Sequence, residues 1–91
     1  MKYKVYLSTS IMGIENGEFW FETDNTKELT PRIMEELRDR KLFKDGYWRY
    51  TALDNAVSID FGSWTRFVVI EGANFGTFFV DSNEEEEERL R

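Results

Sequence analysis

The chain has 91 residues, carries a formal net charge of −6 and contains neither Cys nor His. This length suits one domain with a modest core, and the missing residue types exclude disulfides, thiolate and imidazole metal ligands, and catalytic pairs that need His. No apolar run has the length of a signal peptide or of a membrane span, so we expect a cytoplasmic protein with no membrane partner.

The first two predicted elements form a hairpin. Residues 2–9 alternate between apolar and polar side chains, which is typical of a half-buried strand. Residues 18–23 repeat this alternation, and the Asn-Gly step before them favours a turn. In the second strand, Phe19 and Phe21 are expected to face the core, which turns Trp20 outward.

A single helix is predicted after the hairpin. Thr30 suits its N-cap, because Pro31 then takes the first helical position, where the missing N–H has no cost. The helical period predicts one apolar face, made of Ile33, Met34 and Leu37.

After the helix, apolar and polar residues alternate with a period of two. Four strands are predicted, at 47–53, 56–61, 64–71 and 75–81. Their short connections favour antiparallel neighbours. The stretch 67–70 is apolar on both faces, which indicates a central strand. The residues expected in the core include Leu37, Ile59, Phe67 and Val69.

These elements predict an α+β fold. It is a mainly antiparallel sheet of about five to six strands, in the order β-β-α-β-β-β-β, with the helix packed on one face. Residues 1–81 form the single domain, and residues 82–91 form an acidic C-terminal tail or a frayed short helix.

Carboxylates are the main candidates for chemistry in this chain. The spacing of Asp54, Asp60 and Glu71 singles out no catalytic pair. The five consecutive Glu residues near the C-terminus do not converge as metal ligands must, and no phosphate-binding loop is present. We therefore expect no enzyme, no catalytic residues, no metal and no cofactor.

Aromatic residues make up 16% of the chain, so some are expected at a binding surface. Trp20, flanked by Glu18 and Glu22 on the outer face of its strand, is the first candidate anchor. Trp48 and Arg49 are the next candidates. Because they point to opposite faces of a strand, only one of them is expected at the surface.

The C-terminal acids are the third candidate for partner binding. They could mimic a phosphate backbone on a basic partner, or they could form a solvated tail that aids solubility. Acids interrupt the small basic stretch 38–41 and the chain is acidic overall, so direct nucleic-acid binding is not expected. The run consists of Glu84, Glu85, Glu86, Glu87 and Glu88.

The opening stretch KYKVYLSTSIMGIENGEFWFE resembles small uncharacterised phage and mobile-element proteins that begin with a K-V-x-x-S-T-x-x-x-G pattern. Lys4, Val5, Ser8, Thr9 and Gly13 carry this resemblance. The wider profile of a short, acidic, aromatic-rich chain looks like phage-encoded inhibitors of bacterial defence, the anti-CRISPR proteins in particular. The resemblance implies action inside a host bacterial cell on a host protein with a basic nucleic-acid-binding surface, such as a CRISPR effector. This likeness of overall profile assigns no functional role to any particular residue of the chain.

Three functions remain open from the sequence. The leading prediction is a non-catalytic protein-binding module that acts by occupying a basic surface. The alternative is a small phage accessory protein that self-associates, as a homodimer, through an open sheet edge. A carboxylate-dependent enzyme is the third.

Overall fold

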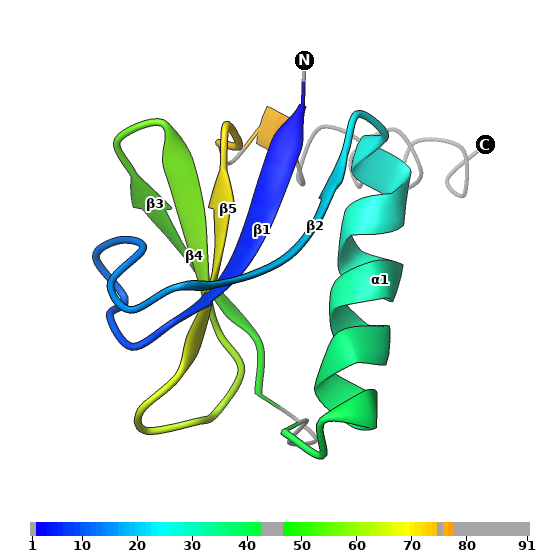
Figure 1. The fold of residues 1–91 in the computed structure, drawn as a ribbon. Coiled ribbons are helices and arrows are strands. Elements are labelled where there is room, and N and C mark those ends of the chain that lie inside the picture. The colour runs from blue at the N-terminus through cyan, green and yellow to red at the C-terminus, as the bar shows by residue number, and fades with distance from the viewer. Residues whose placement is uncertain (1, 43–46, 75, 78–91) are drawn as a thin grey trace, which may run out of the picture.

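A computed structural model describes residues 2–42, 47–74, 76 and 77. Within these residues, a five-stranded antiparallel sheet in the order β2-β1-β5-β4-β3 has the helix α1 on one face (Figure 1). The predicted α+β fold is therefore confirmed. The elements are β1 (Tyr3–Ser8), β2 (Glu18–Thr23), α1 (Thr26–Asp39), β3 (Arg49–Leu53), β4 (Ala56–Asp60) and β5 (Phe67–Glu71).

The central position of β5 is also confirmed. β5 pairs antiparallel with β1 on one side and with β4 on the other. β3, β4 and β5 form a meander, and β1 and β2 form the predicted hairpin. The faces of a strand in the middle of a sheet are covered more completely than those of an edge strand. This position therefore suits a sequence that is apolar on both faces.

The end of the predicted strand series differs from the expectation. The predicted strand 75–81 lies mostly outside the described residues, and Gly76 and Thr77 within it are helical. The predicted tail 82–91, with its run of Glu residues, also lies outside the described residues. β5 begins at Phe67 rather than at residue 64, so the connection from β4 is longer than predicted.

The start of α1 corrects the predicted cap. Asn25 is the N-cap, five residues before Thr30, and its side chain accepts a hydrogen bond from the Lys27 backbone N–H at 3.0 Å. Pro31 therefore lies inside the helix, where Pro costs about 3 kcal/mol. The earlier start brings the fully buried Leu29 onto the inner face. Burial of a Leu contributes about 1.5–3 kcal/mol and a cap about 1 kcal/mol, and together these offset the cost of Pro.

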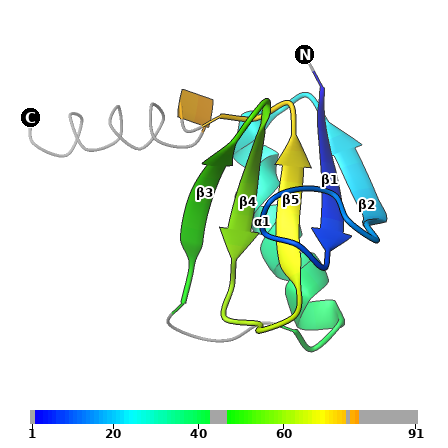
Figure 2. The same ribbon diagram turned by 90° about the vertical axis from the view of Figure 1, so that its left-hand side faces the viewer.

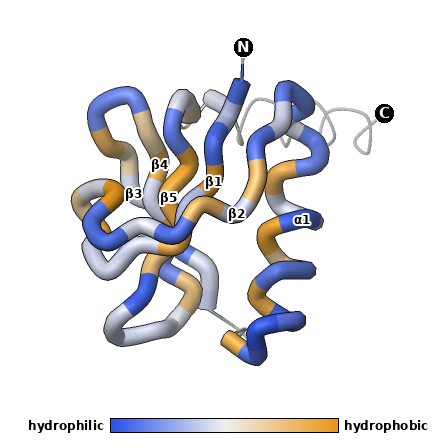
Figure 3. The backbone as a smooth tube through the Cα atoms, viewed as in Figure 1, coloured by the Kyte–Doolittle hydropathy of each residue, from blue (hydrophilic) through white to orange (hydrophobic). Residues whose placement is uncertain are grey.

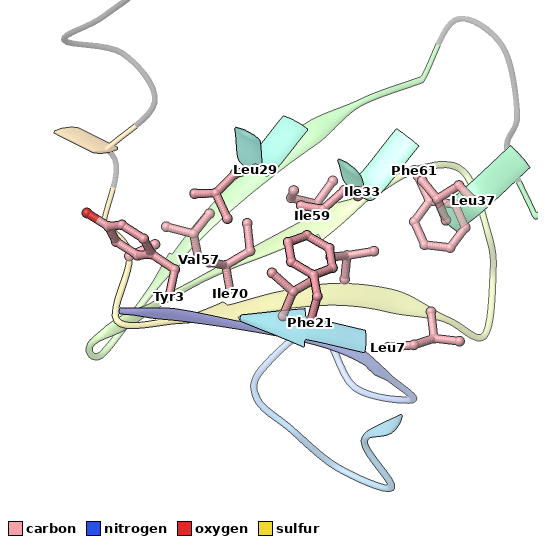
Figure 4. Close-up of a cluster of buried hydrophobic side chains, with 13 residues drawn as sticks. Tyr3, Leu7, Phe21, Leu29, Ile33, Leu37, Val57, Ile59, Phe61 and Ile70 are labelled. Carbon is pink, nitrogen blue, oxygen red and sulfur yellow. The ribbon is translucent and has the colours of Figure 1, made fainter. Parts of the chain in front are cut away.

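The inner face of α1 packs against the sheet and forms the core. The side chains on this face point from the helix toward the strands (Figure 4), while the outer face of the helix is largely hydrophilic (Figure 3). Met34, predicted on this face, is only half-buried. The fully buried residues of the helix follow a spacing of four and are Leu29, Ile33 and Leu37.

Most of the predicted core residues are buried. Leu37, Ile59 and Val69 are fully buried, whereas Phe67 is half-buried. Val69 is buried on the sheet face opposite α1, because its two neighbours in β5 both belong to the cluster beneath the helix. This second face must therefore also be covered.

The C-terminal end of α1 closes with two overlapping hydrogen bonds. The Leu42 N–H donates to the Leu37 carbonyl at 2.8 Å, and the Lys41 N–H donates to the Arg38 carbonyl at 3.0 Å. This pattern is a Schellman motif, in which the residue after the cap has left-handed backbone angles. Lys41 takes that position with φ of 59°, where Gly is usual. Leu42 then packs against the core.

Candidate functional site

A β-bulge in β2 changes the orientation of its aromatic residues. Val5 pairs with Phe21, but the next residue, Tyr6, pairs with Phe19, so Trp20 is the extra residue of the bulge. Phe21 enters the core. Phe19 is 54% exposed and lies edge-on against Tyr6, with 5.5 Å between ring centroids. The prediction that Phe19 and Phe21 share the core face, with Trp20 turned outward, is therefore wrong.

Trp20 belongs to a side-chain cluster that joins β2 to the end of α1. The indole Nε1 donates to Glu18 Oε2 at 2.8 Å, and the Arg40 guanidinium lies 5.0 Å from the Trp20 ring centroid. Arg40 also forms ion pairs with Glu18, at 2.5 Å, and with Glu36, at 3.2 Å. We call these four residues the β2–α1 clasp. Because Trp20 also packs against the core, its first role is to hold the helix to the sheet.

Three acids on or near β2 are paired within the chain. Glu22 lies 3.6 Å from the Lys2 ammonium, and Glu28 lies 3.8 Å from the Arg32 guanidinium. Glu18 is paired through the clasp. Exposed ion pairs contribute little to stability. They do reduce the negative charge that this edge, with the two predicted contact residues Glu18 and Glu22, can present to a partner.

Trp48 and Arg49 lie on opposite faces of the chain, as predicted. Trp48 packs against the core and lies edge-on to Tyr50, with 6.3 Å between ring centroids. Arg49 is exposed, and so is Tyr47. Of the predicted pair, Arg49 is therefore the residue at the surface.

Trp64 is the most exposed large apolar side chain among the described residues, at 93%. It was predicted to begin a strand, but it lies in the connection between β4 and β5. This connection is at the same end of the fold as the C-terminal end of α1 (Figures 1 and 2). The Gly-Ser dipeptide before Trp64 is a turn signal that could have separated it from the strand.

Side-chain hydrogen bonds fix this connection, which we call the Trp64 loop (residues 61–66). Asp60 Oδ1 accepts from the Gly62 N–H at 3.0 Å, and Gly62 has a left-handed φ of 95°. Ser63 Oγ lies 3.2 Å from the Arg66 backbone nitrogen, whose N–H it accepts. Asp and Ser side chains that bind backbone groups two or three residues ahead stabilise tight turns. The loop therefore holds an exposed indole on a defined backbone.

The connection between β1 and β2 covers the second face of the sheet. Residues 9–17, the β1–β2 loop, cross in front of β5 on the side opposite α1 (Figure 2). The fully buried Ser8 hydroxyl organises this loop. Its Oγ accepts from the backbone N–H groups of Ser10 and Glu15, both at 3.0 Å, and donates to the Gly13 carbonyl at 2.6 Å. Ser8 and Gly13, two positions of the quoted sequence pattern, are thus bonded to each other.

A groove separates the tip of the β1–β2 loop from the turn between β3 and β4. Its volume is about 290 Å³. Asp54 and Glu71 are the two acidic residues in its lining. The rest of its lining is mainly apolar and includes Met12, Ile14, Leu53, Ala56 and Val69. We call it the loop–turn groove.

Neither a metal site nor a membrane span is found in the part of the chain that the structure describes. No group of three or more Asp and Glu residues there is arranged to hold a metal ion. None of its helices combines the length and the apolar character that a membrane crossing requires. No protein family model, no curated protein and no solved structure matches this chain.

Proposed function

We propose that the chain is a non-catalytic protein-binding module and that Trp64 is the main anchor of its contact surface. The observation that carries the proposal is the 93% exposure of this side chain on the hydrogen-bonded Trp64 loop. Trp is among the residue types most enriched at interface hot spots.

The size and setting of Trp64 suit an anchor. Burial of about 200 Å² of Trp surface contributes about 5 kcal/mol before the costs of association. A contact loop that is already ordered loses less conformational entropy on binding. Arg66, exposed in the same loop, adds a second residue type that is common at hot spots.

The narrower proposal is inhibition of a host nucleic-acid-targeting enzyme, in the manner of an anti-CRISPR protein. It rests on the overall profile of the chain and on the distribution of its charge. Residues 81–91 hold six acids and two bases, and so carry −4 of the net −6. Because Glu18, Glu22 and Glu28 are paired within the chain, we propose that Glu84 to Glu88 supply most of the attraction to a basic partner.

Capture from a bacterial lysate tests the binding proposal. The wild-type chain, Trp64→Ala and the matched surface variant Phe19→Ala would be immobilised, and the retained proteins quantified with and without nuclease treatment. The wild type and Phe19→Ala should retain the same partner, and Trp64→Ala should lose it. Equal retention by all three would remove Trp64 as the anchor, and retention that nuclease abolishes would indicate a nucleic-acid bridge instead.

A plasmid-interference assay tests the narrower proposal. Expression of the chain in strains with different CRISPR systems should restore transformation by a targeted plasmid in at least one of them. If none is restored although a partner is captured through Trp64, the inhibitor proposal fails and the binding proposal stands. The alternative, a homodimer through a sheet edge, would use β2 or β3, the two edge strands.

A further inference from the structure

We infer that the loop–turn groove binds a lysine or arginine side chain of the partner protein. The inference rests on the proposed protein-binding function and adds the chemistry of a second contact. Residues of the β1–β2 loop, the β3–β4 turn and β5 line the groove. The Trp64 loop lies at the opposite end of the sheet from the β3–β4 turn, next to the C-terminal end of α1 (Figures 1 and 2). The two features can therefore be tested separately.

The apolar lining of the groove fits an aliphatic stem. Leu53 supplies half-buried apolar surface, and Met12, at 73% exposure, and Ile14 supply exposed apolar surface from the loop. Lysine and arginine bury their methylene stems on such surfaces while the charged group stays near water. A Met side chain can adjust to stems of different shape.

The charge of the groove selects a cation. Asp54 and Glu71 both line it, and neither forms an ion pair with a residue that the structure describes. Lys4 is the cross-strand neighbour of Glu71, yet no ion pair within 4.0 Å joins them. An ammonium or guanidinium group can form charge-assisted hydrogen bonds with such carboxylates, whereas an anionic group would be repelled.

Both walls of the groove are held in place before any ligand binds. The Gly72 N–H donates to the Asn55 carbonyl at 2.8 Å, which ties the β3–β4 turn to the end of β5. The β1–β2 loop forms the opposite wall, and the hydrogen bonds of the Ser8 hydroxyl hold it in place. A site with fixed walls loses little entropy when it is filled.

A titration followed by backbone amide NMR shifts tests the inference. The probes are acetyl-Gly-Lys-Gly-amide, acetyl-Gly-Arg-Gly-amide, an uncharged norleucine analogue of the first, and spermidine. The two cationic peptides should shift the amides of residues 12–14, 53–56 and 69–71. Asp54→Asn and Glu71→Gln should each weaken this binding about threefold to fivefold, the effect expected for loss of one exposed ion pair. Glu35→Gln, the same charge change on α1, should leave it unchanged.

Three outcomes would overturn the assignment. Equal binding of the norleucine peptide would show that charge is not recognised, and shifts confined to other residues would show that the groove is not the site. Tighter binding of spermidine than of either peptide would assign the groove to free polyamines. If peptide binding fails while Trp64→Ala still loses the captured partner, the groove assignment alone is wrong. If the peptides bind and Trp64→Ala keeps the partner, the anchor assignment is wrong instead.

Discussion

Ser8 and Ser58 provide a matched pair for testing how the second face of the sheet is covered. Both are fully buried, and their side chains lie on the face opposite α1, because Ser8 pairs with Phe67 and Ser58 with Val69. They differ in hydrogen bonding. Ser8 Oγ binds three backbone groups of the β1–β2 loop, whereas Ser58 Oγ has no partner among the described residues.

The expected effects of the two Ser→Ala variants therefore have different sizes. Each hydrogen bond of Ser8 contributes about 1 kcal/mol, and its loss leaves two backbone N–H groups without this acceptor. Ser8→Ala should lower the free energy of unfolding by about 2–3 kcal/mol. Ser58→Ala removes a buried hydroxyl that has no partner, so it should be neutral or stabilising by up to about 1 kcal/mol.

Urea unfolding, followed by Trp fluorescence and circular dichroism, measures both effects. If the free energy of unfolding depends on urea concentration with the same slope in the variants as in the wild type, the shift in the urea midpoint reports the change in stability directly. Ser8→Ala should also expose the amides of residues 9–17 to faster hydrogen exchange. Equal costs for the two variants, or a larger cost for Ser58→Ala, would refute the role assigned to the Ser8 hydroxyl.

Three further changes test the helix and its attachments by the same unfolding assay. Leu37→Ala should cost about 2–4 kcal/mol, because Leu37 is fully buried, and a cost near zero would mean that α1 does not dock on the sheet. Trp20→Ala should cost about 1–3 kcal/mol, less than a fully buried aromatic residue, and an unchanged midpoint would contradict the β2–α1 clasp. Lys41→Gly should raise the free energy of unfolding by about 0.5–1 kcal/mol, because Gly adopts left-handed backbone angles without strain, although it also raises the entropy of the unfolded chain. A loss of stability would contradict the Schellman motif.

The parts of the fold that follow from local pattern were predictable. The stretch 67–70 is apolar on both faces, and a strand with that pattern must be covered on both sides, so its central position followed from the sequence. The pairing of β1 with β2 followed from alternation and a turn signal. The split between Trp48 and Arg49 followed from the two-residue period of a strand.

The errors arose where contacts between distant residues override local pattern. A bulge adds one residue to a strand and is set by the pairing with β1, so alternation alone placed Phe19 and Trp20 on the wrong sides. Pro31 is a strong helix-start signal, but burial of Leu29 outweighs it. The position of the β1–β2 loop depends on Ser8 bonding a residue seven positions away, which residue types do not reveal.

The predicted anchor residue differs from the one that the structure exposes for the same reason. Trp20 was favoured because it was expected to point outward, and the bulge places it in the clasp instead. Trp64 was overlooked because an aromatic residue followed by Thr resembles the start of a strand. Its exposure depends on the turn that Asp60 and Ser63 stabilise, for which the Gly-Ser dipeptide was the only signal in the sequence.

The affinity of Trp64→Ala for the captured partner tests the central claim most directly. Isothermal titration calorimetry would compare the wild type with Trp64→Ala and with the matched variant Phe19→Ala. Because Trp64 is 93% exposed, its removal should change the free energy of unfolding by less than about 0.5 kcal/mol. The same change should weaken binding by about thirtyfold or more, which corresponds to a hot spot of about 2 kcal/mol. Phe19→Ala should bind nearly as well as the wild type, and a Trp64→Ala affinity within about threefold of the wild type would contradict the account.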